Sequence, residues 1–406
     1  MASRPFNIQT CARPNILKLV PYRCARDDYK DDGTNILLDA NENSYGPSLP
    51  LNGDGKLDGV VFDLGLSKLN RYPDPHQIDL KKLFCNLRNR FDSEFPPLTP
   101  ANLFVGVGSD ECIDALLRCF CVPAKSKILT CPPTYGMYTV SAHINDLTVV
   151  PVPLDLTPGA GFPLRPDAIN EALSADPDIK IVYICSPGNP TGALVHPEHV
   201  KAILDHPTWN GVLVVDEAYV DFAADGSSLA PWVPGYPNFV VMQTLSKAFG
   251  LAGIRLGVAF ASPEVAQLLN NLKAPYSISS PTSILASTAL KPEGLAVMQK
   301  HVSAILTQRQ RLLEELSKIP GIGRFLGGID ANFLLLEVLD APNGKPDNGT
   351  ALKLYEGLAE TKGIVVRFRG KEAGCNGCLR ISIGTETENT KLLEKIRDCL
   401  ASIHAA

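Results

Sequence analysis

The chain alternates between short apolar runs and segments with helical periodicity from about residue 78 to residue 261. Several runs are apolar throughout, which is typical of strands buried on both faces of a mostly parallel sheet. Because helical segments separate these runs, the pattern predicts a doubly wound α/β domain. The expected strands span residues 127–131, 148–151, 180–185, 212–215, 239–242 and 257–261, and helices are expected at 109–121 and 197–205.

A different pattern follows in the last third of the chain. Leucine, isoleucine and valine recur at helical spacing over residues 292–318, and an amphipathic helix is expected at 389–404. Strand-like segments lie between them at 333–338, 363–369 and 378–383, so we predict a smaller α+β domain that follows the long helix. The predicted division is an N-terminal arm (1–36), a lid segment (37–66) with a Gly- and Pro-rich surface insertion at 47–59, a large domain (67–295) and a small domain (296–406).

Composition narrows the class of partner. The net charge over 406 residues is −5, and binding to a phosphate backbone requires concentrated lysine and arginine, so we expect no nucleic acid. No run of about 18 apolar residues is present, so no membrane span is expected. The eleven cysteines are scattered and lie mostly in apolar stretches, which favours reduced thiols and a cytoplasmic location.

Two segments could suggest a metal site, but both have simpler interpretations. Cys375 and Cys378 form a C-x-x-C motif with no second cysteine pair or suitable histidine near it in the sequence. His196 and His199 flank Pro197, which favours the first turn of a helix, so a solvated helix start is expected there. We therefore expect no metal ion.

Polar residues follow three of the predicted strands, at the edge where open α/β sheets bind ligands. Asn189 lies in a turn at 185–192, where it could simply be a turn former. Asp216 ends an apolar run, where a carboxylate is costly unless a cation pairs with it; a helix N-cap is the alternative. Lys247 lies in an apolar, glycine-bearing context, where desolvation would lower its pKa and make it a Schiff-base nucleophile; an ordinary solvated lysine is the alternative.

An anion site is predicted upstream of these strand ends. Gly106, Gly108 and a predicted Ser109 N-cap open the helix at 109–121, so free backbone N–H groups and the positive end of the helix dipole would face an anion. A third glycine at the dinucleotide-binding spacing is missing, which disfavours NAD. Tyr135 follows another predicted strand and could stack on a planar ring, or it could be a core or loop residue.

Together, these residue types match the needs of pyridoxal 5'-phosphate. That cofactor requires an amine, a carboxylate that keeps the ring nitrogen protonated, donors for the phenolate oxygen, an aromatic face and a phosphate site. The residues available for these roles are, in the same order, Lys247; Asp216; Asn189 with Tyr219; Tyr135; and Ser246 with Arg255.

The ordered set Asn189, Asp216, Tyr219, Lys247 and Arg255 resembles the fold type I aminotransferases. The segments LDANENSYGP (38–47), NRYPDP (70–75) and GCLRISIGT (377–385) resemble those of the histidinol-phosphate aminotransferase family, and the similarity covers nearly the whole chain. The sequence departs from the family where a serine at position 44 replaces the common proline and where the 47–59 insertion lengthens the loop. These departures bear on the lid segment and not on the chemistry.

The resemblance implies a fold and a set of roles. The fold is a fold type I pyridoxal-phosphate-dependent transferase, with a mostly parallel central sheet in a large domain and a smaller α+β domain. Lys247 would carry the cofactor and move the substrate proton, Asp216 would hold the ring nitrogen, and Tyr135 would stack on the ring. The phosphate cradle would comprise Ser109, Asp110, Ser246 and Arg255, and Asn189 and Tyr219 would contact the phenolate oxygen.

The resemblance also implies the substrates, which are histidinol phosphate with 2-oxoglutarate, giving imidazole acetol phosphate and glutamate. Arg380, with Arg367, would bind the anionic end of either substrate, since a guanidinium pairs bidentately with phosphate or carboxylate. Tyr45 would lie near the imidazole, and Asn189 would also contact the substrate. A homodimer is implied, in which Tyr72 reaches the cofactor phosphate of the neighbouring subunit.

Other functions fit the same motifs. An aromatic amino-acid aminotransferase or a phosphothreonine-type decarboxylase would use the same scaffold. A regulatory module that binds the cofactor without turnover would need an additional DNA-binding domain, for which the sequence has no segment. A paralogue with an inactive site is disfavoured because Lys247, Asp216 and Arg380 occur together.

Overall fold

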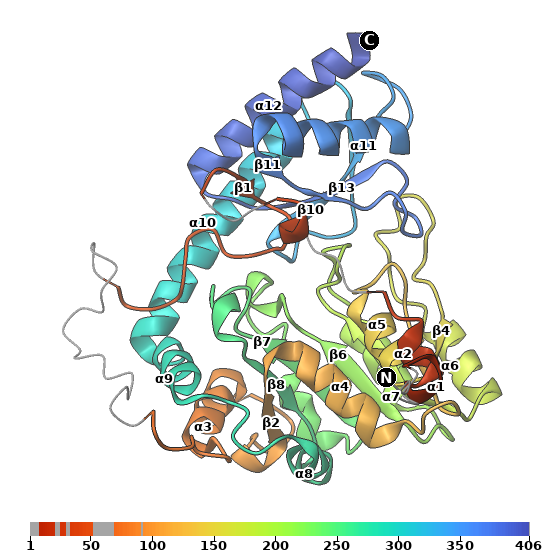
Figure 1. Cartoon of the computed structure of the whole chain (residues 1–406), viewed down its shortest axis with the longest axis vertical. Helices are drawn as coiled ribbons and strands as arrows, with labels where there is room; N and C mark the ends of the chain where they lie inside the picture. The colour runs from red at the N-terminus through yellow and green to blue at the C-terminus, as the bar shows by residue number, and fades with distance from the viewer. Residues whose placement is uncertain (1–7, 21–24, 30–32, 52–68, 91, 406) are drawn as a thin grey trace, which may run out of the picture.

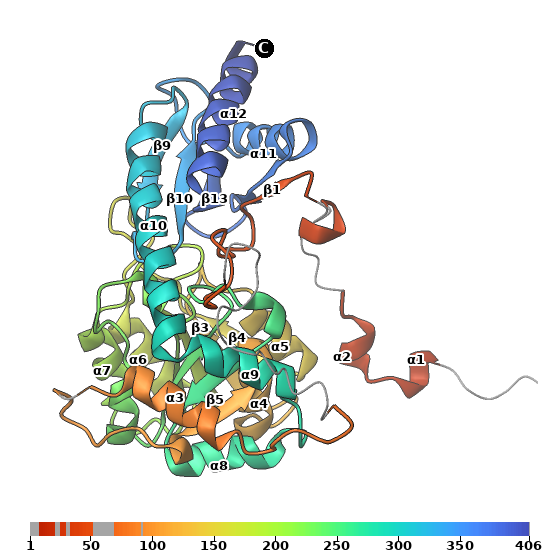
Figure 2. The same cartoon turned by 90° about the vertical axis from the view of Figure 1, so that its left-hand side faces the viewer.

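The structure is a computed structural model that describes residues 8–20, 25–29, 33–51, 69–90 and 92–405. The predicted arm and the insertion at 47–59 lie partly outside the described residues. The described residues contain three sheets: the two larger ones, with their covering helices, form two layers, and the long helix α10 (Pro292–Leu316) runs between them (Figures 1 and 2).

Within the described residues, the larger sheet has seven strands in the order β2-β8-β7-β6-β5-β3-β4. Only β8 runs antiparallel to its neighbours, and the other pairings are parallel. The predicted mostly parallel α/β sheet is therefore confirmed. The strands are β2 (Leu103–Gly106), β3 (Lys127–Thr130), β4 (Thr148–Pro151), β5 (Ile179–Cys185), β6 (Val212–Asp216), β7 (Phe239–Thr244) and β8 (Gly257–Phe260).

Burial explains the apolar runs in this sheet. Every residue of β6 and β7 is buried, because both strands are central and helices cover both faces. The edge strand β4 is partly exposed, and β2 at the other edge, which the sequence pattern did not predict, has only four residues. Length and edge position alone do not explain why β2 was missed, because β4 is also a four-residue edge strand and was predicted.

The second sheet is antiparallel, with the order β12-β13-β10-β9. The single strand predicted at 363–369 is wrong, because the chain breaks at Val366 into two short strands that join different sheets. β11 (Ile364–Val365) pairs in parallel with β1 (Ile36–Leu37), whereas β12 (Arg367–Phe368) joins the antiparallel sheet. The remaining strands are β9 (Ile322–Leu326), which was not predicted, β10 (Phe333–Val338) and β13 (Cys378–Ser382).

The helices cover these sheets and begin with recognisable signals. Proline occupies the first turn of α6, α7, α8 and α10, where its missing N–H costs nothing, and Ser262 caps α8. The helices, besides α10, are α1 (Ile8–Cys11), α2 (Pro14–Leu17), α3 (Ile78–Arg88), α4 (Gly108–Phe120), α5 (Met137–Ile144), α6 (Pro166–Ala175), α7 (Pro197–Leu204), α8 (Pro263–Leu272), α9 (Ser280–Ala289), α11 (Asn348–Glu356) and α12 (Glu386–Ala405). None of the helices in the described part of the chain combines the length and the apolar character that crossing a membrane requires.

Residues 36–49, which we call the strap, connect the two layers. At one end β1 pairs with β11, and the backbone oxygen of Leu38 accepts from Ser382 N at 3.0 Å. Further along, the Asn43 amide donates to the backbone oxygen of Ala248 at 2.9 Å. The strap therefore passes over the loop that follows β7. The domain boundaries given above remain predictions.

Three X-Pro bonds are cis. They are Pro132–Pro133, Ser186–Pro187 and Asn189–Pro190. The sequence does not determine whether the Ser186–Pro187 and Asn189–Pro190 bonds are cis or trans, and it gives no sign of the cis bond at Pro132–Pro133. All three lie directly after strands of the larger sheet, at the edge where the candidate site is found.

Candidate active site

A cavity of about 380 Å³ lies at the carboxyl ends of β5, β6 and β7. Asn189, Asp216 and Lys247, which follow or end these three strands, all line it. The wall opposite the sheet comes from the strap and from the antiparallel sheet, through residues such as Ala40 and Arg380. Its size is that of a site for a small molecule, and its polar groups converge from elements far apart in sequence.

Lys247 is a partly buried amine held by the strap. Its Nζ donates to the backbone oxygen of Ala40 at 2.8 Å and lies 5.9 Å from the centre of the Tyr219 ring. Burial, and then the nearby charge of Arg380, lower the pKa of Lys247 to about 8. Roughly a tenth of this amine is therefore uncharged at pH 7, far more than for a free lysine, and the uncharged form is the one that attacks a carbonyl or accepts a proton.

Asp216 is a buried carboxylate at the end of β6. Its Oδ2 accepts from the Tyr138 hydroxyl at 2.7 Å, and its Oδ1 accepts from Ala218 N at 3.2 Å. Burial raises the pKa of Asp216 to about 6, although these hydrogen bonds act in the opposite direction. Among the described residues no ion pair involves Asp216, and it does not cap an α-helix, which excludes the N-cap alternative. A cation bound in the cavity would compensate this carboxylate.

The Tyr219 hydroxyl oxygen accepts a hydrogen bond, so the hydroxyl proton itself is not used in that bond. The Asn41 amide donates to the Tyr219 hydroxyl oxygen at 3.0 Å, and Asn41 is itself fixed by Ser382, whose hydroxyl donates to its amide oxygen at 3.0 Å. Because Tyr219 accepts from Asn41, its O–H remains available for an acceptor in the cavity. Tyr219 also packs edge-on against Phe333, at 5.1 Å between ring centroids.

Two glycines create a cradle at the start of α4. Gly108 has φ +74°, and a Cβ there would lie 2.6 Å from a terminal nitrogen of Arg255. A Cβ at Gly257 would lie 2.4 Å from the backbone of Gly108 and Ser109. The space next to Arg255 therefore exists only because side chains are missing from these positions, and it is a cradle for an anion at a helix start.

The prediction that Ser109 is the N-cap of this helix is wrong. The helix begins at Gly108, Val107 occupies the N-cap position, and Ser109 lies within the first turn. The left-handed conformation of Gly108 allows the turn to start one residue earlier than the side-chain signal suggested. Ser109 still lines the cavity, with Asp110, whose Oδ2 lies 3.3 Å from an Arg255 terminal nitrogen.

Arg380, on β13, is a buried cation for which the described residues provide no ion pair with a carboxylate. It is 4% exposed, donates to Asn189 Oδ1 at 2.6 Å and to the backbone oxygen of Asp39, and leaves its Nε without a partner. Burial, and then the charge of Arg369, lower the pKa of Arg380 to about 9. A buried guanidinium satisfied only by neutral oxygens is a receptor for an anion.

Most of the predicted site residues meet in this cavity. Tyr45 and Tyr72 are the two that do not line it. Tyr45 lies beside His301, at 6.0 Å between ring centroids, and Tyr72 is 81% exposed and stacked on Tyr276. The predicted residues that line the cavity are Ser109, Asp110, Tyr135, Asn189, Asp216, Tyr219, Ser246, Lys247, Arg255, Arg367 and Arg380.

Sequence reasoning missed three contributors. Tyr138 lies on α5, three residues after Tyr135, and its hydroxyl donates to Asp216 on β6. This contact depends on tertiary structure. Asn41 lies in the segment LDANENSYGP (38–47), among several polar residues, and nothing in that segment distinguishes it from its neighbours. Arg369 also lines the cavity, two residues after Arg367.

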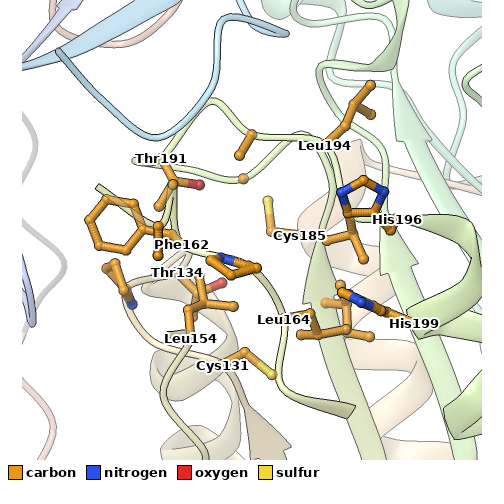
Figure 3. A pocket seen from close by; sticks show the side chains of 18 residues that line it. Cys131, Thr134, Leu154, Phe162, Leu164, Cys185, Thr191, Leu194, His196 and His199 are labelled. Atoms are coloured by element: carbon orange, nitrogen blue, oxygen red, sulfur yellow. The ribbon is translucent and has the colours of Figure 1, made fainter. Parts of the chain in front are cut away.

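A smaller cavity of about 110 Å³ adjoins the first, and Thr134 and Cys185 line both (Figure 3). Figure 3 shows the rings of His196 and His199 on one side of it and Phe162 on the other. No aspartate, glutamate, lysine or arginine is among its described lining residues. In the described part of the chain, no group of three His, Cys, Asp or Glu side chains is arranged to hold a metal ion.

Comparison with known proteins places the chain in a family. Residues 36–396 match the family described as aminotransferase class I and II. A histidinol-phosphate aminotransferase of Schizosaccharomyces pombe is 53% identical over 393 residues, which is 97% of this chain and 97% of that protein. The enzyme of the same name from Candida maltosa is 49% identical, over 98% of this chain and 100% of that protein.

Solved structures agree on the fold. A histidinol-phosphate aminotransferase of Sinorhizobium meliloti, in complex with pyridoxal-5'-phosphate, superposes with a TM-score of 0.80, 24% identity and coverage of 96% of this chain and 97% of that one. An aspartate aminotransferase mutant of Thermus thermophilus gives a TM-score of 0.74 at 20% identity, over 96% of this chain and 99% of that one. The predicted fold type I architecture is thus confirmed.

Proposed function

The chain belongs to the aminotransferase class I and II family, and from this premise we propose that it exchanges an amino group between L-histidinol phosphate and 2-oxoglutarate, giving imidazole acetol phosphate and glutamate. This reaction belongs to histidine biosynthesis, and its cofactor is pyridoxal 5'-phosphate. The relatives of that name match over nearly their full length. The observation that carries the proposal is that a partly buried amine, a buried carboxylate and a buried guanidinium line one cavity.

The residues of the cavity fit the cofactor. When bound, pyridoxal 5'-phosphate supplies an aldehyde that captures amines and a ring that withdraws electrons from the substrate Cα. Asp216 would hold the protonated ring nitrogen, which would compensate its buried charge. The cradle beside Arg255 would take the phosphate, with Ser109, Asp110 and Ser246 around it, and Tyr135 would lie against the ring face.

Lys247 has two tasks in this proposal. It would attach the cofactor, and it would then accept the proton from the substrate Cα and deliver it to the cofactor carbon that carries the aldehyde in the free cofactor. A pKa of about 8 suits both tasks, because the amine can be neutral when it accepts the proton and can hold the proton afterwards. The O–H of Tyr219 and the amide of Asn189 would donate to the phenolate oxygen of the cofactor.

Arg380 would bind the far end of either substrate, with Arg367 beside it. Histidinol phosphate carries a phosphate ester where glutamate carries its α-carboxylate, and a guanidinium fork can pair with either anion. One arginine can therefore serve both half-reactions. Tyr45 is proposed to lie near the imidazole once the strap and the substrate are in place.

The proposal is tested by single-turnover half-reactions of the holoenzyme with histidinol phosphate and with phenylalanine. We expect kcat/KM to be larger for histidinol phosphate by at least about 100-fold, since one good charged contact contributes roughly that factor. A preference for phenylalanine would instead identify an aromatic amino-acid aminotransferase. Spectral capture of substrate without turnover would indicate a regulatory module or an inactive paralogue.

A homodimer forms part of the proposal. Tyr72 is exposed in the single chain and does not line the cavity of its own subunit. We propose that it reaches the cofactor phosphate in the partner subunit. Mixing Lys247→Ala and Tyr72→Ala subunits tests this, because a hybrid dimer then has one site with both residues intact. Recovery of activity on mixing, to roughly a quarter of wild type when half of the dimers are hybrids, is the expected result. No recovery would place Tyr72 in its own subunit's site or outside any site.

We also propose a cytoplasmic location. Each cysteine in the described residues is a free thiol, including the closely spaced Cys375 and Cys378. Such usage is typical of a reducing compartment. Cell fractionation with a tagged chain is the direct test.

A further inference from the structure

A third arginine lies beside the proposed substrate anion. Arg369 lines the same cavity as Arg367 and Arg380, and these three residues are here called the arginine group. Arg367 is opposite Arg380 in the β12–β13 pairing, and Arg369 follows β12 directly. The arrangement therefore places three positive charges at one end of the cavity.

Backbone and side-chain contacts hold Arg369 in place. Its backbone N–H donates to Cys378 O at 2.9 Å, which closes the hairpin between β12 and β13. A terminal nitrogen of its guanidinium donates to Glu372 Oε1 at 2.6 Å, and the Glu372 N–H donates to Arg369 O at 3.0 Å. The guanidinium is thus tethered within a short loop and is not a freely moving surface group.

Two hydrogen-bond donors of the arginine group have no acceptor among the described residues. The Nε atoms of Arg369 and Arg380 are both buried without a hydrogen-bond partner, and Arg380 itself is almost fully buried. An unpaired buried donor costs free energy, so a ligand that accepts from it is favoured. Both orphaned atoms belong to residues that line the cavity.

Charge compensation within the arginine group is incomplete. Among the described ion pairs, Glu372 is the carboxylate that joins the arginine group, through Arg369, and none of these pairs involves Arg367 or Arg380. Arg369 is the charged neighbour that contributes most to the lowered pKa of Arg380. Three neighbouring guanidinium groups attract a dianion more strongly than a monoanion, because each positive charge interacts with twice the negative charge.

We infer that Arg369, positioned by Glu372, is a specificity-determining residue that favours a phosphate monoester dianion over a carboxylate at the arginine group. A phosphate monoester has a second pKa of about 6, so it is a dianion above pH 7 with three acceptor oxygens. The α-carboxylate of glutamate has one charge and two oxygens. This inference rests on the proposed function for the identity of the phosphate substrate.

The test compares Arg369→Gln, Arg369→Lys and Arg324→Gln in the holoenzyme, whose cofactor phosphate site is filled. Arg324 is the matched control, because it pairs with Glu337 on the same antiparallel sheet at 2.7 Å and does not line the cavity. Each variant is measured in both half-reactions, with histidinol phosphate and with glutamate, and in competitive inhibition by inorganic phosphate at pH 8. Thermal unfolding shows whether each variant is folded.

We expect Arg369→Gln to raise KM for histidinol phosphate and Ki for inorganic phosphate by about 10- to 100-fold, and KM for glutamate by less than about 3-fold. Arg369→Lys should recover most of the loss, and Arg324→Gln should match wild type. Equal effects on both substrates, or no effect on either, would overturn the inference.

The inorganic phosphate measurement separates this inference from the proposed function. If wild type does not turn over histidinol phosphate, the proposed function fails, while a selective rise in Ki for phosphate in Arg369→Gln still supports a dianion site. If wild type uses histidinol phosphate and Arg369→Gln leaves both KM and Ki unchanged, only the inference about Arg369 fails.

Discussion

The two ends of the cavity differ in how their charges are satisfied. At the cofactor end, around Lys247, Asp216 and Arg255, each charged group has a partner within the chain: Ala40 O, the Tyr138 hydroxyl and Asp110, respectively. At the arginine group, buried Nε atoms of Arg369 and Arg380 have no partner. Each end also carries a buried charge that a ligand of opposite sign would compensate: the carboxylate of Asp216 at the first end favours a bound cation, and the guanidinium of Arg380 at the second favours a bound anion.

The sheets that build the two ends account for this difference. The carboxyl ends of β5, β6 and β7 come together in a parallel sheet whose central strands are fully buried, so their positions are fixed by the core. The arginine group lies on an antiparallel hairpin with one face toward the cavity. A cofactor remains bound through every cycle, whereas two substrates must enter and leave. The guanidinium donors without a partner among the described residues therefore lie at the end where the substrates exchange.

The largest effect is expected from a substitution at the cofactor end. Lys247→Ala removes the amine that attaches the cofactor and moves the proton, so turnover should fall by roughly 10⁴-fold. The visible absorbance change on adding pyridoxal 5'-phosphate should be lost in the same variant. Titration of the purified protein with the cofactor, followed by absorbance, measures this.

Lys81 provides the matched control for this experiment. It is buried, and desolvation also lowers its pKa to about 8, but it does not line the cavity. Lys81→Met should keep both the spectral change and the turnover. An unchanged spectrum in Lys247→Ala would mean that the cofactor is attached elsewhere and that the proposed role of Lys247 is wrong.

Arg380→Gln should have the next largest effect, and it tests the substrate end as a whole. Loss of a buried, hydrogen-bonded charge costs about 3–4 kcal/mol, so kcat/KM should fall by about 10²- to 10³-fold. Both half-reactions should be affected, because the same guanidinium binds phosphate and carboxylate. Single-turnover rates with histidinol phosphate and with glutamate measure the two losses.

The contrast with Arg369→Gln sharpens the comparison between the two arginines. Arg380 should act on both substrates and Arg369 on the phosphate substrate alone. If Arg380→Gln impaired only one half-reaction, the idea that one arginine serves both anions would be wrong.

A stability measurement on the cofactor-free chain tests the carboxylate of the cofactor end. Burial raises the folded-state pKa of Asp216 from 3.8 to about 6, so the ionised form is disfavoured by folding. The associated stability is fully present below pH 4 and is lost as the pH rises through about 6. Above that pH, Asp216→Asn should therefore be more stable than wild type, by up to about 3 kcal/mol.

Urea unfolding of both proteins at pH 4.5 and pH 7.5 measures the difference in the free energy of unfolding between Asp216→Asn and wild type. This difference should widen with pH. Glu217→Gln is the neighbouring control, since Glu217 is also buried but accepts from Ser228, Leu229 N and Gln243. Burial also raises the pKa of Glu217, but the substitution turns one of its two acceptor oxygens into an NH2 donor that faces other donors, so Glu217→Gln should destabilise the chain. A gap for Asp216→Asn that does not depend on pH would show that Asp216 is not a strained carboxylate.

The cofactor end was largely predictable from sequence, because each of its residues follows an apolar run. Asp216 and Lys247 are marked by the contrast between a charged side chain and the buried strand before it. The order of the strands and the antiparallel direction of β8 could not be read, since hydrophobicity carries no information on pairing. Fold class was therefore predictable, whereas sheet topology was not.

The substrate end was less predictable. Arg380 was identified from a family motif, but the break of the 363–369 segment at Val366, which turns Arg367 and Arg369 toward the cavity, has no local signal. Tyr138 and Asn41 act through contacts with residues 78 and 178 positions away, respectively. Such pairings depend on tertiary structure, which periodicity within a single element cannot reveal.

The smallest effect is expected at the strap, which touches both ends. Asn41 is 1% exposed and donates to the Tyr219 hydroxyl, while its backbone oxygen accepts from the Asn332 amide at 3.0 Å. Asn41→Ala removes the donor that orients the Tyr219 proton toward the cavity, a loss of about 1 kcal/mol, so kcat should fall by about 5- to 10-fold. KM for either substrate should change little, because the arginine group is untouched.

A second signal separates positioning from loss of stability in this variant. The pH at which the visible band of the bound cofactor changes should rise, since a less well oriented Tyr219 stabilises the negative phenolate oxygen less. Asn102→Ala is the control, because Asn102 is also buried and hydrogen-bonded, to Ala261 O at 3.0 Å, but lies away from the cavity. It should lower stability without moving that pH. If Asn41→Ala lowered stability but left both kcat and the spectral pH unchanged, the strap would be a structural connection between the two layers and would not tune the cofactor end.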